Sequence, residues 1–332
     1  MNITTTTPVI AAVVIGRNEG ARLVGCLASL TGSESDEISR IIYVDSGSTD
    51  GSVEAARAAG AEVVELNMDQ PFTAARARNA GLAVLQAINA PDLVQFVDGD
   101  CTVRPGWIGA ARAFFAIHPK VAVVSGRCRE QFPDASIYNR LCDREWDTPI
   151  GQAKTCGGNA MMRMEALDQI GGFDPRLIAG EEPELCVRLR INGWKIWRIN
   201  AEMVLHDAAM TRFGQFWKRA RRGGHARAEG VVMHGAPPVF HCVAGLRRAL
   251  TWGFAFPVVI VVAALKTPFA LLGLLIYPAK ILQLGLKDKS HEKHRWKLAT
   301  LLVMIRFPEA QGALEYFWKH LIGKRFKIME YK

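Results

Sequence analysis

Residues 93–100 read Leu-Val-Gln-Phe-Val-Asp-Gly-Asp, a short hydrophobic run that ends in two carboxylates two positions apart. A run of this kind, with little polar alternation, is typical of a strand buried on both faces of a sheet. Similar runs occupy residues 9–15 and 41–44, and each is also followed by polar residues; a third strand is expected over residues 61–66, which makes the run at 93–97 the fourth. Helical patterns separate the runs, over residues 21–30, 52–59 and 72–88. The alternation predicts an α/β domain with a Rossmann-like, mostly parallel sheet flanked by helices.

The second half of the predicted domain is less regular. A helix that ends near His118 and a strand over residues 121–125 continue the pattern. Residues 126–155 are aromatic and show no period, so they are expected to be a loop on the acceptor side of the site. A further helix and two short strands are expected at the end of the domain, over residues 182–192, 195–199 and 203–205.

Polar residues directly follow three of the predicted strands. They are Asn18 and Glu19 after the first strand, residues 45–50 after the second, and residues 98–100 after the fourth. Ligands of α/β sheets bind outside the carboxyl ends of the strands, so these residues are the first candidates for a site. The carboxylate of Asp45 could accept hydrogen bonds from a nucleotide base or ribose, although this segment also suits a turn that caps a helix.

Asp98 and Asp100 have the chemistry of a metal site. Carboxylate oxygens are hard ligands that suit Mg²⁺ or Mn²⁺, and such an ion can bridge a diphosphate and neutralise charge on a leaving group. An isolated Asp-Gly-Asp is more often a turn. The position of this one after a buried strand, in line with the other two polar strand ends, favours the metal site.

Other enzyme classes lack support in the sequence. Neither Gly-x-Gly-x-x-Gly nor Gly-x-x-x-x-Gly-Lys-Ser/Thr occurs, which argues against a dinucleotide enzyme and a P-loop kinase. The seven cysteines are widely spread and never spaced as Cys-x-x-Cys, so neither a disulfide framework nor a zinc site is indicated. A reducing cytoplasm is the expected environment.

The motifs, in this order, resemble those of family 2 glycosyltransferases, which have the GT-A fold. The resemblance spans about residues 8–225 and rests on Asn18-Glu19, residues 45–50, Asp98 and Asp100, Gly-Gly-Phe-Asp at 171–174, and Glu-Glu-Pro-Glu-Leu at 181–185. It implies an inverting, metal-dependent hexosyltransferase that uses a nucleotide-sugar donor.

The resemblance also implies roles for individual side chains. Glu182 takes the position of the general base, where the family usually has aspartate, so Glu181 and Glu184 remain alternatives. The implied nucleotide-binding residues are Asn18, Glu19, Asp45, Ser46, Gly47, Arg76 and Asp98. The implied ligands of Mn²⁺ or Mg²⁺ are Asp98, Asp100 and His206, and the implied acceptor-side residues are Gly158, Asn159, Glu181 and Glu184.

Two of these assignments have plain alternatives. Arg76 and Arg78 belong to an Arg-x-Arg-Asn-x-Gly stretch that is similar to one of the family and usually faces the nucleotide. A pair of solvated arginines fits the same residues. His206 follows the last predicted strand and could add a metal ligand, but a surface histidine fits equally well.

The charge is divided unevenly along the chain. Residues 1–209 carry 20 Lys and Arg against 26 Asp and Glu, whereas residues 210–332 carry 21 against 6. Two very apolar stretches, 249–265 and 268–286, lie within the basic part, and each is close to the roughly 17–25 residues that cross a bilayer. Basic residues flank their outer ends, which favours a hairpin with both ends cytoplasmic. A single tilted span and two buried amphipathic helices are the alternatives.

Three regions are therefore expected: a transferase domain (1–230), a membrane-associated hairpin (231–290) and a basic cytoplasmic tail (291–332). Residues 213–227 predict a basic amphipathic helix in the headgroup layer. The expected partners are a nucleotide-sugar donor, a lipid-linked or saccharide acceptor and the cytoplasmic face of the plasma membrane. Nucleic acid is not expected, because the basic excess lies beside apolar stretches. Transfer to a polyprenyl phosphate and a non-catalytic scaffold of the same fold are the rival functions.

Overall fold

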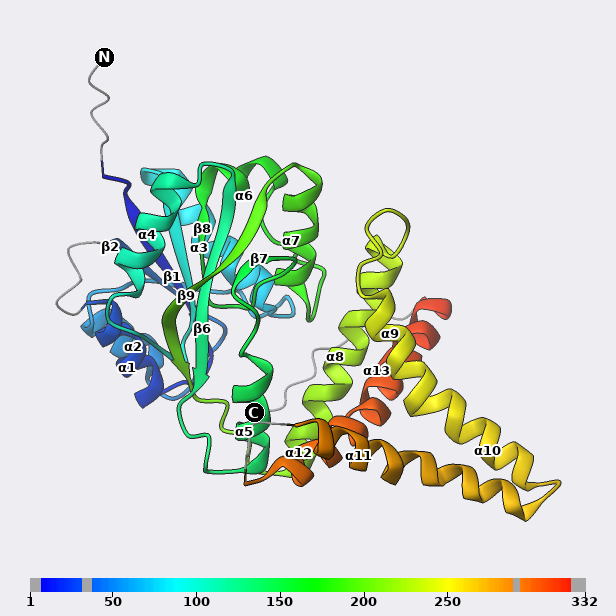
Figure 1. Ribbon diagram of the computed structural model, residues 1–332. Helices are drawn as coiled ribbons and strands as arrows, with labels where there is room; N and C mark the ends of the chain where they lie inside the picture. The colour runs from blue at the N-terminus through cyan, green and yellow to red at the C-terminus, as the bar shows by residue number, and fades with distance from the viewer. Residues whose placement is uncertain (1–6, 32–37, 289–292, 324–332) are drawn as a thin grey trace. The chain divides into compact units, whose positions relative to one another are not determined.

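The computed structural model describes residues 7–31, 38–288 and 293–323 (Figure 1). The other residues of the predicted basic tail, at its start and after 323, lie outside the described residues. The chain divides into two compact units, one comprising residues up to Phe132 and Cys142–Ala208, the other Pro133–Leu141 and the residues from Ala209 onward. This structural division precedes α8 (Phe213–His234), so the predicted boundary at residue 230 stays a proposal about functional regions.

A mixed sheet forms the centre of the first unit. The strand order is β3, β2, β1, β4, β8, β6, β9 and β5, and β7 pairs with β9. The first four strands are parallel, while β8 runs antiparallel to β4 and β6. The strands are β1 (Ile10–Gly16), β2 (Ile38–Asp45), β3 (Glu62–Glu65), β4 (Leu93–Asp98), β5 (Cys101–Val103), β6 (Val121–Glu130), β7 (Gly151–Ala153), β8 (Ala160–Arg163) and β9 (Lys195–His206). The predicted α/β fold is confirmed.

The central strand β1 shows why the hydrophobic runs lack polar alternation. Ala12 and Val14 belong to one buried cluster, which also contains Trp107. Ala11 and Val13 belong to a second cluster, in which packing comes from other helices. Both faces of the strand are therefore covered, as expected for a sheet between two helical layers. The helices of this unit are α1 (Ala21–Leu30), α2 (Ser52–Ala58), α3 (Ala74–Ile88), α4 (Trp107–Ile117), α6 (Met164–Ile170) and α7 (Glu181–Ile191).

Residues 126–155 contain regular structure where a loop was expected. β6 continues to Glu130, and α5 (Ile137–Glu145) and β7 follow. Charged side chains interrupt the hydrophobic pattern of this stretch, but those that are buried have partners. Arg127 donates to Asp143 Oδ1 at 3.0 Å, and the carboxylate of Glu130 accepts hydrogen bonds from two backbone N–H groups. A hydrophobic pattern cannot reveal a strand whose buried side chains are charged. The loop prediction is wrong over most of this stretch.

The two short strands expected near the end of the domain, 195–199 and 203–205, form the single strand β9. It pairs with β6 through three register shifts, two of them beside Arg127. The polar residues in its middle interrupt the hydrophobic pattern. One of them, Glu202, lies at the surface in an ion pair of 2.7 Å with Arg129.

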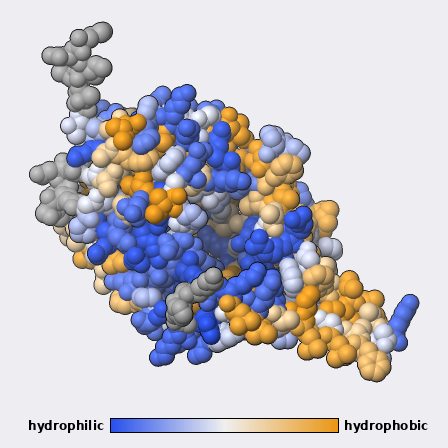
Figure 2. Space-filling model, in the orientation of Figure 1, coloured by the Kyte–Doolittle hydropathy of each residue, from blue (hydrophilic) through white to orange (hydrophobic). Residues whose placement is uncertain are grey.

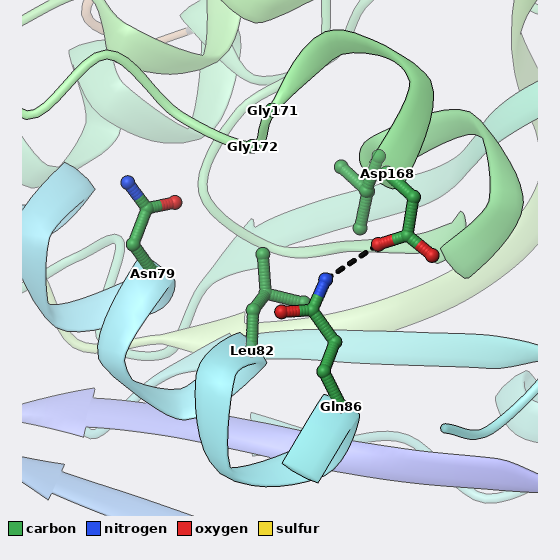
Figure 3. A pocket seen from close by; sticks show the side chains of 7 residues that line it. Asn79, Leu82, Gln86, Asp168, Gly171 and Gly172 are labelled. Carbon is green, nitrogen blue, oxygen red and sulfur yellow. Dashed lines mark hydrogen bonds between the residues drawn. The ribbon is translucent and has the colours of Figure 1, made fainter.

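A groove of about 480 Å³ runs along α3 and α6 (Figure 3). Asn79 Oδ1 accepts from Phe173 N–H at 2.9 Å, and Asn79 Nδ2 donates to the carbonyl oxygen of Phe173 at 2.7 Å. These two hydrogen bonds hold the Gly-Gly-Phe-Asp segment against α3. None of the lining residues is predicted to be catalytic, so the groove is not the candidate active site. They are Asn79, Leu82, Gln86, Leu167, Asp168, Gly171 and Gly172.

The second unit contains a bundle in which α8 crosses α13 (Arg306–Leu321) at very short range. A Cβ atom on Gly224 would lie 1.9 Å from the carbonyl oxygen of Glu309, and one on Gly312 would lie 1.9 Å from that of Arg221. Only glycine permits this approach. The bundle also contains α9 (Val243–Leu250) and α12 (Arg295–Met304). Much of the predicted tail is therefore helical and packed, since α12 and α13 lie within it and their apolar residues recur at helical spacing.

Two long helices of the second unit are largely unburied. One runs over Val243–Ala264 and includes α9 and α10 (Phe256–Ala264), and the other runs over Pro268–Lys287 and includes α11 (Ile276–Lys287). Each has the length and apolar composition to cross a bilayer, and only 11% and 6% of their apolar windows are buried. Figure 2 shows the hydrophobic surface that they form. Core helices of a soluble protein would be mostly buried. The low burial of these two helices therefore does not fit the alternative of two buried helices.

Candidate active site

Three predicted site segments lie side by side at the carboxyl edge of the parallel strands. β1 pairs with both β2 and β4, with Gly16 opposite Asp45 and Ile15 opposite Asp98. The backbone continues this alignment past the strand ends, because Gly99 N–H donates to the carbonyl oxygen of Ile15 at 2.8 Å. The polar strand ends therefore form one continuous edge.

The segment after β1 is fastened to the segment after β2. Asn18 N–H donates to Ser48 Oγ at 2.9 Å, and Asn18 Oδ1 accepts from Thr49 N–H at 2.8 Å. Asn18 has a φ of 54°, in the left-handed region that asparagine tolerates better than most residues. Glu19 pairs with Arg22 at 2.7 Å. These residues shape the edge on which a nucleotide contact is predicted.

Asp45 is buried and organises its own loop. Its Oδ1 accepts from the Tyr43 hydroxyl at 2.9 Å, and its Oδ2 accepts from the N–H groups of Gly47 and Ser48, both at 2.8 Å. Ser46, next to it, is also buried. Both oxygens of Asp45 thus have partners within the protein, and its contact with a base or ribose stays a prediction.

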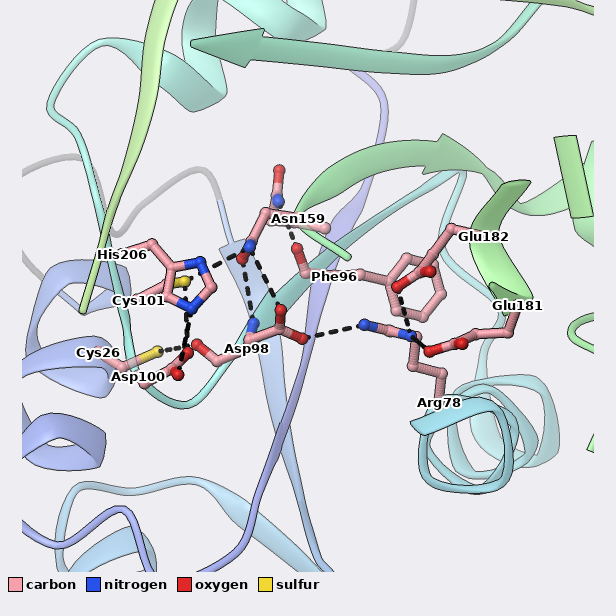
Figure 4. A network of polar contacts seen from close by, with 11 residues as sticks. Cys26, Arg78, Phe96, Asp98, Asp100, Cys101, Asn159, Glu181, Glu182 and His206 are labelled. Carbon is pink, nitrogen blue, oxygen red and sulfur yellow. Dashed lines mark hydrogen bonds and ion pairs between the residues drawn. The ribbon is translucent and has the colours of Figure 1, made fainter. Parts of the chain in front are cut away.

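Arg78 lies at the centre of a charged network (Figure 4). Its side chain is buried, and Nη2 lies 2.9 Å from Asp98 Oδ1. Nη1 lies 3.0 Å from Glu181 Oε1 and 2.9 Å from Glu182 Oε1. A guanidinium stays charged at all accessible pH values, so it offsets part of the repulsion among the three carboxylates. One cation joins the end of β4 to the start of α7.

Arg76, the arginine assigned to the nucleotide, has different partners. Its guanidinium donates to the carbonyl oxygens of Asn67, at 2.7 Å, and Gln70, at 2.9 Å, in the loop before α3. The same Arg-x-Arg stretch thus contributes one arginine to a loop and another to the site. Sequence spacing places both on one helix but does not say which of them faces the carboxylates.

Gly158 and Asn159 also contact the end of β4. Asn159 Oδ1 accepts from Asp98 N–H at 3.0 Å, and Asn159 Nδ2 donates to Cys101 Sγ at 3.4 Å. A Cβ atom on Gly158 would lie 2.5 Å from Arg78 Nη2 and 2.7 Å from Asp98 Oδ2. Glycine is therefore required for the Arg78–Asp98 pair to form as it does. The acceptor-side role of both residues stays a prediction.

Glu182 is the least buried of the three acidic residues in the first turn of α7. Its side chain is 14% exposed, against 6% for Glu181 and 3% for Glu184. Glu184 is held by the guanidinium of Arg188 on the next turn, at 2.7 Å. Burial, together with the charge of Glu181, raises the pKa of Glu182 to about 7, although Arg78 opposes the rise. A carboxylate that titrates near neutrality is suited to accept a proton at physiological pH.

Asp100, Cys101 and His206 place their ligand atoms within 4.8 Å of one another. His206 Nε2 lies 3.2 Å from Asp100 Oδ2, and Cys101 Sγ donates to Asp100 Oδ1 at 3.6 Å. A carboxylate with an imidazole suits Mn²⁺ better than Mg²⁺, which prefers oxygen ligands. Asp98, the other predicted ligand, is paired with Arg78, and its contact with a metal stays a prediction.

Cys101 and Trp146 are at the site without any sequence signal that pointed to them. Cys101 immediately follows the Asp-Gly-Asp motif, but a buried cysteine in a strand is usually ordinary core. Trp146 stacks on His206 with a centroid distance of 4.6 Å and an interplanar angle of 3°. It lies in the stretch expected to be loop. The position of an aromatic ring over a distant histidine depends on tertiary structure alone.

The mixed sheet, the aligned carboxylates at its edge and the acidic helix fit the GT-A fold of glycosyltransferases. The sequence profile described as "Glycosyl transferase family 2" matches residues 11–171. Over these residues the chain is similar to glycosyltransferase family 2, and the resemblance predicted from the motifs is confirmed.

Two curated proteins and one solved structure show how far the similarity extends. The chain is 28% identical over 230 residues to the pre-mycofactocin glycosyltransferase of Mycobacterium tuberculosis, a match that covers 65% of this chain and 46% of that protein. It therefore spans about half the length of that relative. The succinoglycan biosynthesis protein ExoA of Rhizobium meliloti is 25% identical over 244 residues, covering 70% of this chain and 71% of that one. The mannosyltransferase PcManGT from Pyrobaculum calidifontis, solved with GDP-Man and Mn²⁺, has the same fold, with a TM-score of 0.66 at 21% identity, over 95% of this chain and 88% of that one.

Proposed function

We propose that this glycosyltransferase is an inverting, Mn²⁺-dependent hexosyltransferase. Its donor is a nucleotide-sugar, with a UDP-sugar favoured over GDP-mannose, and its acceptor is a lipid-linked saccharide or a growing polysaccharide. The observation that carries the proposal is the shared network of Figure 4, in which a carboxylate with a pKa near 7 and a carboxylate–imidazole pair lie at one edge of the sheet.

Each charged group then has a chemical task. Glu182 accepts the proton of the acceptor hydroxyl while the hydroxyl oxygen attacks the anomeric carbon from the face opposite the diphosphate. The new bond forms as the bond to the diphosphate breaks, so the configuration at that carbon inverts. Arg78 holds Glu182 and Asp98 in fixed relation, which provides orientation. A Mn²⁺ ion bound by Asp100 and His206 would supply positive charge for the leaving diphosphate.

The relatives support this class of donor and acceptor but leave the sugar open. PcManGT was solved with GDP-Man and Mn²⁺, and ExoA is named for succinoglycan biosynthesis. Transfer to a polyprenyl phosphate is the second candidate within the same class. A non-catalytic scaffold is disfavoured because Asp98, Asp100 and Glu182 are all present.

A screen of nucleotide-sugars tests the proposal directly. Purified protein is incubated with each UDP-sugar and with GDP-mannose, with Mn²⁺ or with a chelator, and release of the nucleoside diphosphate is measured. We expect release with one donor, dependent on the metal and accelerated by the correct acceptor. Release from no donor, with or without acceptor extracts, would favour the scaffold. Product anomeric configuration by NMR then tests inversion.

The pKa of Glu182 predicts the pH dependence of kcat. Only the ionised carboxylate can accept a proton, so kcat should rise tenfold per pH unit below about pH 7 and reach a plateau above it. The measurement is kcat between pH 5.5 and 8.5 at saturating donor and Mn²⁺. A profile that stays flat between pH 6 and 8 would contradict the assignment of Glu182 as the base.

We further propose that the helices Val243–Ala264 and Pro268–Lys287 cross the plasma membrane as a hairpin whose two ends both lie on the cytoplasmic side. Their large apolar side chains are exposed on both helices, and such a surface exceeds what soluble monomers tolerate. Lys266 lies between the helices, where a hairpin would place it near the far headgroups, whereas a single span would hold it in the bilayer centre at a cost of about 2.5–3.5 kcal/mol or more. Lys280 lies within the second helix and donates to Gln283 at 2.7 Å.

The hairpin predicts that salt alone does not release the protein from membranes. In 1 M NaCl the Debye length falls to about 3 Å, which removes attraction between surface charges but leaves apolar insertion intact. Isolated membranes are washed with salt or with detergent and the pellet is probed for the protein. The control variant, Arg247→Gln with Arg248→Gln, removes two exposed cations and should stay in the pellet. Release of the wild type by salt would contradict the hairpin.

A further inference from the structure

The indole of Trp146 covers one face of the His206 imidazole. The two rings are nearly parallel, at 3°, and their centroids are 4.6 Å apart. Trp146 directly follows α5, and its N–H donates to the carbonyl oxygen of Cys142 at 2.9 Å. On the imidazole, Nε2 lies 3.2 Å from Asp100 Oδ2. Trp146 thus contacts a proposed metal ligand without offering a ligand atom itself.

Two buried arginines hold the backbone around Trp146 in place. Arg127 lies 3.0 Å from Asp143 Oδ1 and 3.4 Å from Asp147 Oδ1. Arg198 lies 3.4 Å from the same oxygen of Asp147. Arg127 and Arg198 are only 6% and 5% exposed, and burying a guanidinium is costly unless it is paired. The carboxylates on both sides of Trp146 are thereby anchored to β6 and β9, the latter being the strand that ends at His206.

We propose that Trp146 is a positioning residue that holds the His206 ring in the orientation that directs Nε2 to the metal. The inference rests on the proposed function, in which His206 and Asp100 bind Mn²⁺. Without the indole, the imidazole could rotate about its χ2 torsion, which is broad for histidine. Residues that orient a metal ligand typically contribute about 10–100-fold to metal affinity. Trp146 therefore sets the affinity for Mn²⁺ and leaves the chemistry to the residues of the network.

Direct binding of Mn²⁺, measured from the electron paramagnetic resonance signal of the free ion, tests this without turnover. For the full chain in detergent, Trp146→Ala should weaken Mn²⁺ binding about 10-fold or more, while Trp146→Phe, which keeps an aromatic face, should stay within about 3-fold. Trp194→Ala is the matched control, because Trp194 is also half-buried but donates to Gln169, away from the site. It should bind Mn²⁺ like the wild type.

Repeating the Trp146→Ala substitution in a variant that lacks His206 distinguishes a positioning role from general destabilisation of the protein. In the His206→Ala variant the indole has no imidazole to orient, so adding Trp146→Ala should change Mn²⁺ affinity little further. If the alanine variant does not fold, Trp146→Leu, which keeps bulk without the aromatic face, is measured in its place. Wild-type affinity in Trp146→Ala or in the leucine variant would overturn the inference. Failure of the wild-type protein itself to bind Mn²⁺ would instead overturn the metal part of the proposed function, and the inference with it.

Discussion

Glu182→Gln should lower kcat by about 10²–10⁴-fold while the KM for the donor stays close to that of the wild type. The substitution keeps the shape of the side chain but removes its ability to accept a proton. Arg78 still pairs with Asp98 and Glu181 in the variant, so the donor side of the network retains its charge balance. The measurement is kcat and KM with the donor identified by the nucleotide-sugar screen, at saturating Mn²⁺ and acceptor.

The neighbouring glutamates provide the control. Glu184→Gln weakens the ion pair with Arg188, which lies on the same helix, but leaves the contacts between Arg78 and Glu182 unchanged, so kcat should change only a few-fold. The rise of kcat with pH should disappear in Glu182→Gln and persist in Glu184→Gln. A large loss of kcat in Glu184→Gln with a mild effect in Glu182→Gln would move the base to Glu184. The equivalent result for Glu181→Gln would move it to Glu181.

The part of the site built on strand ends could be predicted from the sequence, because parallel strands bring their carboxyl ends to one edge whatever the details of packing. Asn18, Asp45 and Asp98 meet in this way, with Gly16 opposite Asp45 and Ile15 opposite Asp98. Hydrophobic runs without alternation were sufficient to indicate these strands. The order of the motifs then indicated the family.

The parts that could not be predicted depend on side-chain direction and on buried charge. Arg76 and Arg78 lie two positions apart on one helix, so they face different directions, and only the structure shows that Arg78 gathers the carboxylates. β6 escaped detection beyond residue 125 because its inward side chains include Arg127, whose charge is offset by Asp143. Pairing over such sequence distances leaves no local pattern.

The glycines of the second unit show a related limit. Gly224 and Gly312 look unremarkable in the sequence of a basic segment, yet each is the contact point of a helix crossing. The crossing of α8 and α13 could not be predicted, because its two contact points lie far apart in the sequence. Gly158 differs in that its place beside a predicted motif suggested a role, and the structure supplies the reason in the atoms of Arg78 and Asp98.

Asp100→Asn should abolish Mn²⁺ binding and reduce Mn²⁺-dependent turnover by at least about 10²-fold, while the protein stays folded. An amide of the same size replaces a carboxylate oxygen that lies 3.2 Å from His206 Nε2, so a charged ligand is lost while packing is kept. The backbone carbonyl of Asp100 still accepts from Asp207 N–H at 3.1 Å. The expected cost to the free energy of unfolding is about 1–3 kcal/mol, that of one altered buried hydrogen bond.

Turnover, Mn²⁺ binding and thermal unfolding of Asp100→Asn are best measured beside Asp168→Asn. Asp168 is exposed on α6, where it accepts from Gln86, and its loss removes the same charge from the same unit. If net charge alone governed the metal, both variants would lose affinity equally. If Asp100 and His206 form the donor set as proposed, only Asp100→Asn should lose affinity for Mn²⁺, and raising the Mn²⁺ concentration should not restore its rate. A near-normal rate of Asp100→Asn at saturating Mn²⁺ would remove Asp100 from the proposed metal site and leave Asp98 as the remaining candidate ligand of the Asp-Gly-Asp motif.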